Sequence, residues 1–210
     1  MTNATRDVGG WGELGPRRYQ RYVAAFDWVV HCVNEGYYLE AIAVLDSLIC
    51  ERLGSRLGHV TKKPVETVDT CSKLCKKLVG RNSTVGSEED PSFCEAIKDI
   101  QKWLARRNEA MHATAKVLRS DRSPKDFTAI LQSHKQDAID GIRCLRAFDD
   151  LDAESRKVAE KIPATSPNAF FPERRGIYPR TELPRELRLQ KGSSANSMGT
   201  SRAATNNRGT

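Results

Sequence analysis

The sequence predicts an all-α fold, a bundle of four to five helices followed by a basic and largely disordered C-terminal tail. Apolar residues recur at three- and four-residue spacing in five successive stretches, and no stretch alternates strictly between apolar and polar residues. With 210 residues, 39% of them hydrophobic and 29% charged, the chain has room for one domain with a proper core. We expect a flexible N-terminus at 1–15, a helical domain at 16–161, and a Pro/Arg-rich, then low-complexity tail at 162–210.

The first two helices are predicted at 17–34 and 37–57. In both stretches the apolar positions repeat with the period of a helix, and Gly36 interrupts the pattern between them. Gly54 and Gly58 are expected to end the second helix, because glycine is the residue that most often follows a helix. The short link predicts that the two helices pack as antiparallel neighbours.

Three further helices follow. A shorter pattern at 65–79 predicts the third, and a polar loop at 80–90 separates it from a fourth that runs from Pro91 to about Leu118. We expect the inward positions of the fourth helix to include Phe93, Ile97, Ile100, Leu104, Met111, Ala115 and Leu118.

The fifth helix is predicted to open with a capping box, Ser123 at the cap and Asp126 three residues later, and to continue to Leu145. A short charged helix is expected at 152–161. Beyond it, proline, glycine, serine and asparagine dominate, and this composition is typical of a chain that cannot bury a core.

The net charge of +7 lies mainly in the tail. Residues 163–210 contain eight Lys/Arg and three Asp/Glu, whereas the preceding 162 residues contain 26 and 24 and are therefore close to neutral, at +2. A basic tail attracts phosphate or an acidic partner protein, so the charge gives only weak support to RNA binding. The arm at 170–189 interleaves aromatic residues with arginines, including Arg174, Arg175 and Arg180, and is a candidate contact for RNA or a regulatory partner, although packing on its own domain is an equal alternative.

The composition predicts a soluble, cytoplasmic protein without a membrane anchor. The first residues lack an apolar signal core, and the longest apolar run, 41–45, is too short to cross a bilayer. Six cysteines fall inside helical patterns and are expected to be reduced and mostly buried. Cys71 and Cys75, with His59 or Cys94, have poor spacing for zinc, and no Gly-rich phosphate loop, G-x-S-x-G or H-E-x-x-H motif occurs, so we expect neither metal nor cofactor.

The run Arg107-Asn108-Glu109-Ala110-Met111-His112 is the main candidate site. An imidazole exchanges protons near neutral pH, and a guanidinium holds a phosphate oxygen in a two-pronged grip. On a helix, Asn108 and His112 share a face, but Arg107 and His112 lie about 140° apart. Arg107 also occupies a position at which the apolar periodicity of the fourth helix predicts an apolar residue.

This divergence predicts a homodimer in which two copies of the helix border one cleft, because a two-fold interface uses the same patch on both subunits. Two imidazoles in that cleft suit RNA cleavage by the 2′-hydroxyl: one removes the 2′ proton and the other protonates the departing 5′ oxygen. Arg107 would stabilise the charge on phosphorus, and Asn108 would orient the His or bind phosphate. Arg106 is a weaker candidate for contact with RNA or a partner.

The spacing Arg107-Asn108-x-x-x-His112, on a late helix of a small all-α domain, resembles the R-x4-6-H motif of the HEPN family. The preceding helix, with its Tyr37-Tyr38-Leu39-Glu40-Ala41 opening and Leu48-Ile49-Cys50-Glu51-Arg52-Leu53 continuation, is similar to the long helix before the motif in that family. The resemblance covers roughly residues 17–150. It implies a metal-independent ribonuclease that dimerises across the motif helices and acts in toxin–antitoxin pairs or antiviral defence, with Arg107 and His112 catalytic and Asn108 supporting them.

Two positions depart from the pattern of the family. Toxins paired with a minimal nucleotidyltransferase have a Tyr two residues after the His, where this chain has Thr114, which puts that mode of control in doubt. Ala113 stands where glycine is common. The alternative is a helical module that dimerises, or binds a nucleotide or RNA, without cutting; its motif would then be a polar pair on a plain bundle.

Overall fold

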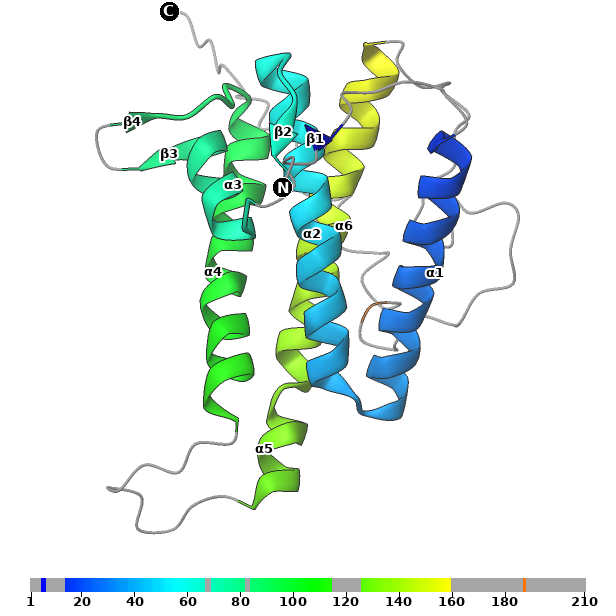
Figure 1. The fold of residues 1–210 in the computed structure, drawn as a ribbon. Helices are drawn as coiled ribbons and strands as arrows, with labels where there is room; N and C mark the ends of the chain where they lie inside the picture. The colour runs from blue at the N-terminus through cyan, green and yellow to red at the C-terminus, as the bar shows by residue number, and fades with distance from the viewer. Residues whose placement is uncertain are drawn as a thin grey trace, which may run out of the picture.

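The computed structural model describes residues 5–6, 14–66, 69–81, 84–114, 126–159 and 187, and these residues are predominantly helical (Figure 1). The prediction of an all-α fold is therefore confirmed. The arm at 170–189, apart from residue 187, and most of the tail lie outside the described residues, as does most of 1–15.

Helices α1 (Leu14–Glu35) and α2 (Tyr38–Thr61) are antiparallel neighbours, as the short link predicted (Figure 1). Gly36 has a φ of +84° in this link, a left-handed conformation that glycine adopts without strain. The prediction that Gly54 and Gly58 end α2 is wrong, because both lie buried within the helix. Burial of the apolar face on both sides of them outweighs the cost of about 1 kcal/mol for a glycine inside a helix.

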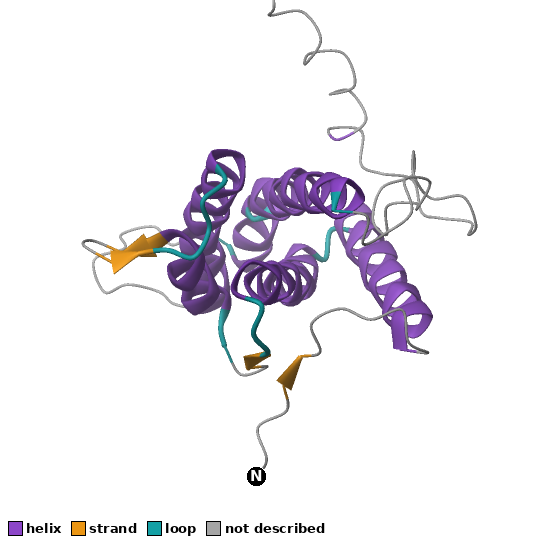
Figure 2. Cartoon of the chain, turned by 90° about the horizontal axis from the view of Figure 1, so that it is seen from above, coloured by secondary structure: helices purple, strands orange, loops and turns teal. Residues whose placement is uncertain are grey.

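Helix α3 (Cys71–Val79) is shorter than predicted at its start. Instead, β2 (Val65–Glu66) pairs with β1 (Thr5–Arg6), and Thr70 caps α3 by accepting a hydrogen bond from the backbone N–H of Lys73, at 3.4 Å. The predicted polar loop after α3 contains an antiparallel pair of very short strands, β3 (Gly80–Arg81) and β4 (Thr84–Val85). Seen from above, the strands lie at the edge of the group of helices (Figure 2).

Helix α4 (Pro91–Ala113) begins where the sequence predicted, with Asp90 accepting a hydrogen bond from the backbone N–H of Ser92 at 2.8 Å. It ends at Ala113, earlier than expected, and the predicted inward positions 115 and 118 lie outside the described residues. Met111 was predicted to face inward but is 42% exposed, whereas Ala110 is fully buried. Near its C-terminal end, the buried face of α4 follows Trp103 and Ala110, which places Met111 at its margin.

The prediction of a single fifth helix is wrong. A turn at His134 separates α5 (Phe127–Ser133) from α6 (Lys135–Val158). Asp126 caps α5 by accepting hydrogen bonds from the backbone N–H groups of Thr128 and Ala129, at 3.2 and 3.1 Å, and Ser123, the predicted cap, lies outside the described residues. The short helix expected at 152–161 is the last part of α6, because the chain stays helical from Leu145 onward.

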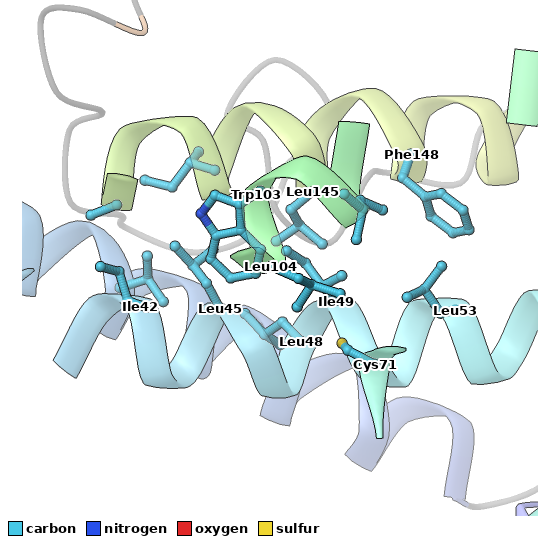
Figure 3. Close-up of a cluster of buried hydrophobic side chains, with 14 of the residues drawn as sticks. Ile42, Leu45, Leu48, Ile49, Leu53, Cys71, Trp103, Leu104, Leu145 and Phe148 are labelled. Carbon is cyan, nitrogen blue, oxygen red and sulfur yellow. The ribbon is translucent and has the colours of Figure 1, made fainter. Parts of the chain in front are cut away.

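The core contains buried residues of α1, α2, α3, α4 and α6. Figure 3 shows Trp103 and Leu104 of α4 against Leu45 of α2, with Leu145 of α6 beside them. The indole Nε1–H of Trp103 donates to the backbone carbonyl of Asp137, at 2.8 Å, which satisfies the one polar group of this fully buried side chain. α4 is thereby held against α2 and α6.

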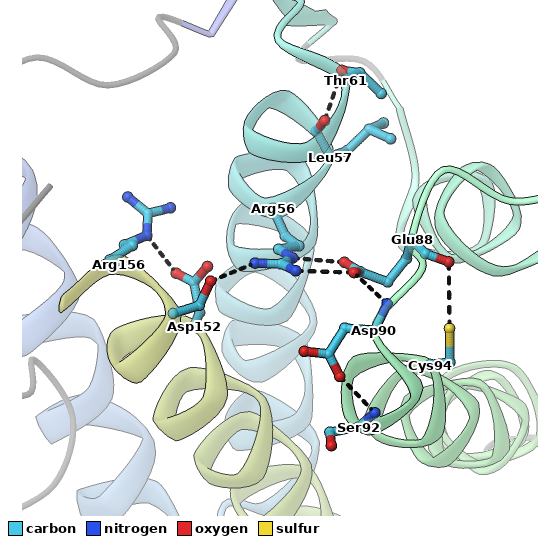
Figure 4. A network of polar contacts seen from close by, with 10 residues as sticks. Arg56, Leu57, Thr61, Glu88, Asp90, Ser92, Cys94, Asp152 and Arg156 are labelled. Atoms are coloured by element: carbon cyan, nitrogen blue, oxygen red, sulfur yellow. Dashed lines mark hydrogen bonds and ion pairs between the residues drawn. The ribbon is translucent and has the colours of Figure 1, made fainter. Parts of the chain in front are cut away.

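A buried arginine joins the end of α2 to the segment before α4 and to α6 (Figure 4). Arg56 donates to both carboxylate oxygens of Glu88, at 2.6 and 2.9 Å, and to Ser155, at 3.0 Å. Its guanidinium carbon lies 3.6 Å from the ring centroid of Phe93. This charge is therefore paired in two-pronged geometry and packed on an aromatic face, the conditions under which a buried ion is tolerated.

Candidate functional site

The motif lies on α4, and the structure turns Arg107 toward α2 of its own chain. The Nη2 of Arg107 donates to Oδ2 of Asp46, and the Nη1 donates to Oδ1 of Asn108 at 2.7 Å. The side chain of Arg107 is 26% exposed, so its head group lies at the boundary between the helix interface and solvent. The position that looked anomalous on an apolar stripe is thus occupied by a cation with an acidic partner on the neighbouring helix.

Asp46 is a site residue that the sequence reasoning missed. The sequence feature that could have indicated it is an acid directly after Leu45, within the apolar pattern of α2. At this position the Asp46 side chain reaches the interface with α4. Among the described residues, Oδ1 of Asp46 and Nε of Arg107 are buried and have no hydrogen-bond partner. The ion pair therefore uses one carboxylate oxygen only and leaves polar atoms of both groups unsatisfied.

Asn108 braces the guanidinium of Arg107 rather than the imidazole of His112. Its side chain is exposed, and its carbonyl oxygen accepts the bond from Arg107 described above. Asn108 was expected to orient the His or to bind phosphate, and the structure shows neither role. It shows instead that Asn108 orients Arg107. Arg107 is consequently oriented from two sides, by an acid on α2 and by its own neighbour on α4.

His112 is exposed in the last turn of α4. The helix is regular from Arg107 to His112, so no local distortion brings the two side chains together. Five helical steps separate them by about 140° around the axis and about 7.5 Å along it. Within one chain, the guanidinium points to α2 and the imidazole lies on the solvent side of the helix.

A second imidazole lies at the end of α4. The Thr114 hydroxyl donates to the backbone carbonyl of Ala110, and its oxygen lies 3.1 Å from Nε2 of His134. Nδ1 of His134 lies 3.5 Å from Oδ2 of Asp137. The order Thr114, His134, Asp137 resembles the nucleophile, base and acid of a catalytic triad. The hydroxyl proton of Thr114, however, is already donated to the carbonyl of Ala110 on α4. The contacts serve to attach the end of α4 to the start of α6.

Arg106 pairs with acids of α6, although its side chain is 47% exposed. Its guanidinium pairs with Asp137 at 3.3 Å and with Asp140 at 2.9 Å. Arg106 is therefore already neutralised by two acids, which lowers its value as a contact for phosphate. The other candidate contacts, Arg174, Arg175 and Arg180, lie outside the described residues.

The thiols of α2 and α3 are arranged as core groups. The Cys50 thiol donates to the backbone carbonyl of Asp69 at 3.3 Å, and the Cys71 thiol donates to that of Asp46 at 3.4 Å. Hydrogen bonding with Cys50 and burial raise the pKa of Cys71, and burial raises the pKa of Cys75 to about 12. Cys71 and Cys75 therefore stay protonated at neutral pH, whereas a metal is bound by thiolates.

Within the described ranges, no group of three or more His, Cys, Asp and Glu side chains is placed to hold a metal ion. The six cysteines, all of them described, are free thiols. No helix in the described part of the chain is both long enough and apolar enough to cross a bilayer.

Comparison with known proteins gives no match. No protein-family model, no curated protein and no solved structure is similar to this chain.

Proposed function

We propose that the protein is a metal-independent endoribonuclease whose active site forms across a homodimer at the C-terminal half of α4. One observation carries the proposal: Arg107 is held at the boundary of the helix interface by Asp46 and Asn108, while His112 is exposed on the same helix. A fixed cation and an accessible imidazole are the two groups that cleavage by a 2′-hydroxyl requires.

The reaction needs one base and one acid. One imidazole takes the proton of the 2′-hydroxyl, whose oxygen attacks the adjacent phosphorus, and a second imidazole gives a proton to the departing 5′ oxygen. The products are a 2′,3′-cyclic phosphate and a 5′-hydroxyl. Arg107 binds the phosphate oxygens as their charge increases. DNA is not a substrate because it lacks the 2′-hydroxyl.

The geometry of one chain supports the proposed dimer. Each α4 offers one exposed His112, and that imidazole lies on a different side of the helix from Arg107. A second α4 packed about a two-fold axis supplies the other imidazole and brings a second arginine to the same cleft. Met111, which is 42% exposed beside His112, contributes apolar surface to such an interface.

Mixed dimers test the composite site. Arg107→Ala and His112→Ala proteins are each expected to lose at least a hundred-fold in cleavage of mixed RNA in EDTA, since each role is worth roughly 10²- to 10⁴-fold. Dimers that combine one parent chain with one His112→Ala chain, isolated with two affinity tags, should also lose at least a hundred-fold, because the composite site needs both imidazoles. A site contained within one chain would instead stay active in this mixed dimer, because the parent chain has both groups.

The matched control is Lys98→Ala on the same helix. Lys98 is exposed and pairs only at the surface with Glu95, so its loss removes a charge from α4 without touching the site. Cleavage with this variant should equal that of the parent. Intact RNA with parent protein that sediments as a dimer would sink the ribonuclease proposal.

A ribonuclease of this kind harms its own cell unless it is restrained, so we propose that it acts in the cytoplasm as a toxin or phage-defence effector with an antitoxin or regulatory partner. Expression of the parent chain alone should arrest growth, and His112→Ala should relieve the arrest at equal protein level. Equal growth with both proteins would contradict the toxic role.

The second candidate is a helical dimerisation or nucleotide/RNA-binding module that does not cut. The observation that favours it is the Asp46–Arg107 ion pair, because a phosphate must compete with a carboxylate for this guanidinium. If the protein is such a module, it should dimerise or bind RNA, and the RNA should stay intact. In the ribonuclease, by contrast, the carboxylate positions Arg107, and Asp46→Asn should reduce cleavage while the dimer persists.

A further inference from the structure

The outer face of α1 has a line of cationic and aromatic side chains that the proposed active site does not use. Arg17, Arg21 and Trp28 are exposed, and His31 is half-buried beside Trp28. On a helix these four residues fall within an arc of about 80° and extend over about 21 Å. We call them the α1 stripe.

The charges of the stripe are not explained by the stability of α1. No acidic residue occurs from Leu14 to Phe26, whereas Arg17 lies near the start of the helix and Glu35 ends it. The helix dipole favours the opposite order, acids near the start and bases near the end. In the described part of the chain, Arg17 and Arg21 have no acidic partner, so their charges are available to a ligand.

The aromatic end of the stripe offers a flat surface. Trp28 is 53% exposed, and its ring centroid lies 5.2 Å from that of His31 at an interplanar angle of 38°. Unpaired bases stack on such rings, whereas paired bases are already stacked in a duplex. The spacing along one helix therefore places a phosphate-binding end next to a base-stacking end.

We propose that the α1 stripe binds single-stranded RNA, with Arg17 and Arg21 on phosphates and Trp28, supported by His31, under a base. A membrane surface is a poorer fit, because an interfacial helix needs a broad apolar face, and on the arc of the stripe only Trp28 and the neighbouring Ala24 are apolar. An acidic protein accounts for the arginines but not for the exposed ring pair. The inference stands whether or not α4 cuts RNA.

The α1 stripe is separate from the candidate active site. Figures 1 and 2 show α1 at one side of the bundle and α4 at the other, with α2 and α6 between them. A dimer that forms through α4 therefore leaves α1 uncovered. RNA held on α1 would increase the local concentration of substrate at the cleft without entering the chemistry.

Fluorescence anisotropy with a labelled 12-nucleotide oligouridine, measured on His112→Ala protein at several salt concentrations, tests the stripe without interference from cleavage. Arg17→Ala/Arg21→Ala should weaken binding at least ten-fold at low salt and reduce the slope of log K against log salt by about 1.4, since each phosphate contact on a single strand contributes about 0.7. Trp28→Ala should weaken binding roughly five- to a hundred-fold and leave that slope unchanged.

The control is Lys73→Ala/Lys76→Ala, which removes two exposed charges from α3. It should bind like the His112→Ala parent. Equal loss with this control would overturn the proposal in favour of diffuse charge attraction, and parental affinity with either α1 variant would overturn the assigned contacts. Binding to phosphatidylserine vesicles without binding to oligouridine would identify a membrane surface instead.

Discussion

Arg107 carries the proposed chemistry, and its position depends on Asp46. Both side chains are about three-quarters buried, so the pair stands between a solvent-exposed ion pair, worth about 0–1 kcal/mol, and a buried one, whose disruption costs about 3–5 kcal/mol. An energetic coupling of intermediate size is the physical expectation.

Asp46→Asn and Arg107→Met should each lower the free energy of unfolding, and the double variant should lose about 1–3 kcal/mol less than the sum of the two. Each single change leaves one charged group without its partner, whereas the double change removes both. Urea denaturation of the four proteins gives the coupling energy. Additive losses would mean that the ion pair contributes nothing to stability.

Tyr22 gives the protein a pH-dependent stability at the alkaline end. Burial, followed by the charge of Glu51 and the 2.8 Å hydrogen bond to it, raises the pKa of Tyr22 from 10.0 to about 12. Since the folded pKa is the higher one, the stabilisation is complete below pH 10 and is lost as the pH rises from 10 to 12.

Tyr22→Phe should therefore show a shallower decrease in the free energy of unfolding between about pH 10 and 12 than the parent. Tyr37→Phe, at an exposed tyrosine between α1 and α2, is the control and should follow the parent curve. The measurement is urea denaturation at a series of pH values. Parallel curves for parent and Tyr22→Phe would contradict the assignment.

At the scale of elements, the period of the apolar residues was sufficient to predict α1, α2, α3 and α4 but not every boundary. α2 continues through Gly54 and Gly58 because the helix is buried both before and after these two glycines. A local sequence pattern does not show which residues will be buried by tertiary contacts. His134, at the break, contacts Thr114 just after α4 and Asp137 of α6, and a periodicity of apolar residues gives no sign of these contacts.

The packing of α6 on α4 and α2 predicts the effect of one glycine substitution. A Cβ atom on Gly141 would lie 2.8 Å from the ring of Trp103 and 2.9 Å from Cδ1 of Leu45. Gly141→Ala should thus destabilise the protein by about 1–3 kcal/mol, although alanine is the better helix former by about 1 kcal/mol.

Thermal unfolding followed by circular dichroism measures the effect of Gly141→Ala. Ala147→Gly, at an exposed position of the same helix, isolates helix propensity and should cost about 0.5–1 kcal/mol. If Gly141→Ala were neutral or stabilising, the helices would not be in the close contact described.

At the scale of the whole molecule, the two proposed RNA contacts lie on opposite sides of the α2–α6 layer, so their contributions to cleavage should separate. Arg17→Ala/Arg21→Ala should raise KM for a long RNA several-fold and leave kcat within about two-fold, because binding that is equal in ground and transition states changes KM alone. With a dinucleotide substrate, too short to reach α1, the variant should match the parent.

Steady-state cleavage of the two substrates provides this comparison. A decrease in kcat on the dinucleotide would indicate that α1 affects the cleft through the fold and not through RNA. His112→Ala, in contrast, should lower kcat on both substrates, because it removes a proton-transfer group and not a binding contact.

The sequence by itself determined the helical class, most of the elements and the location of Arg107, Asn108 and His112 on a late helix, because apolar periodicity and residue spacing are local properties. Only the tertiary structure decided that Asp46 is the partner of Arg107, since the two residues are 61 positions apart and meet when α2 packs on α4. It also decided that Arg106 is neutralised by α6 and that Met111 is exposed. Each of these outcomes depends on which faces of distant helices come into contact, and no local pattern contains that information.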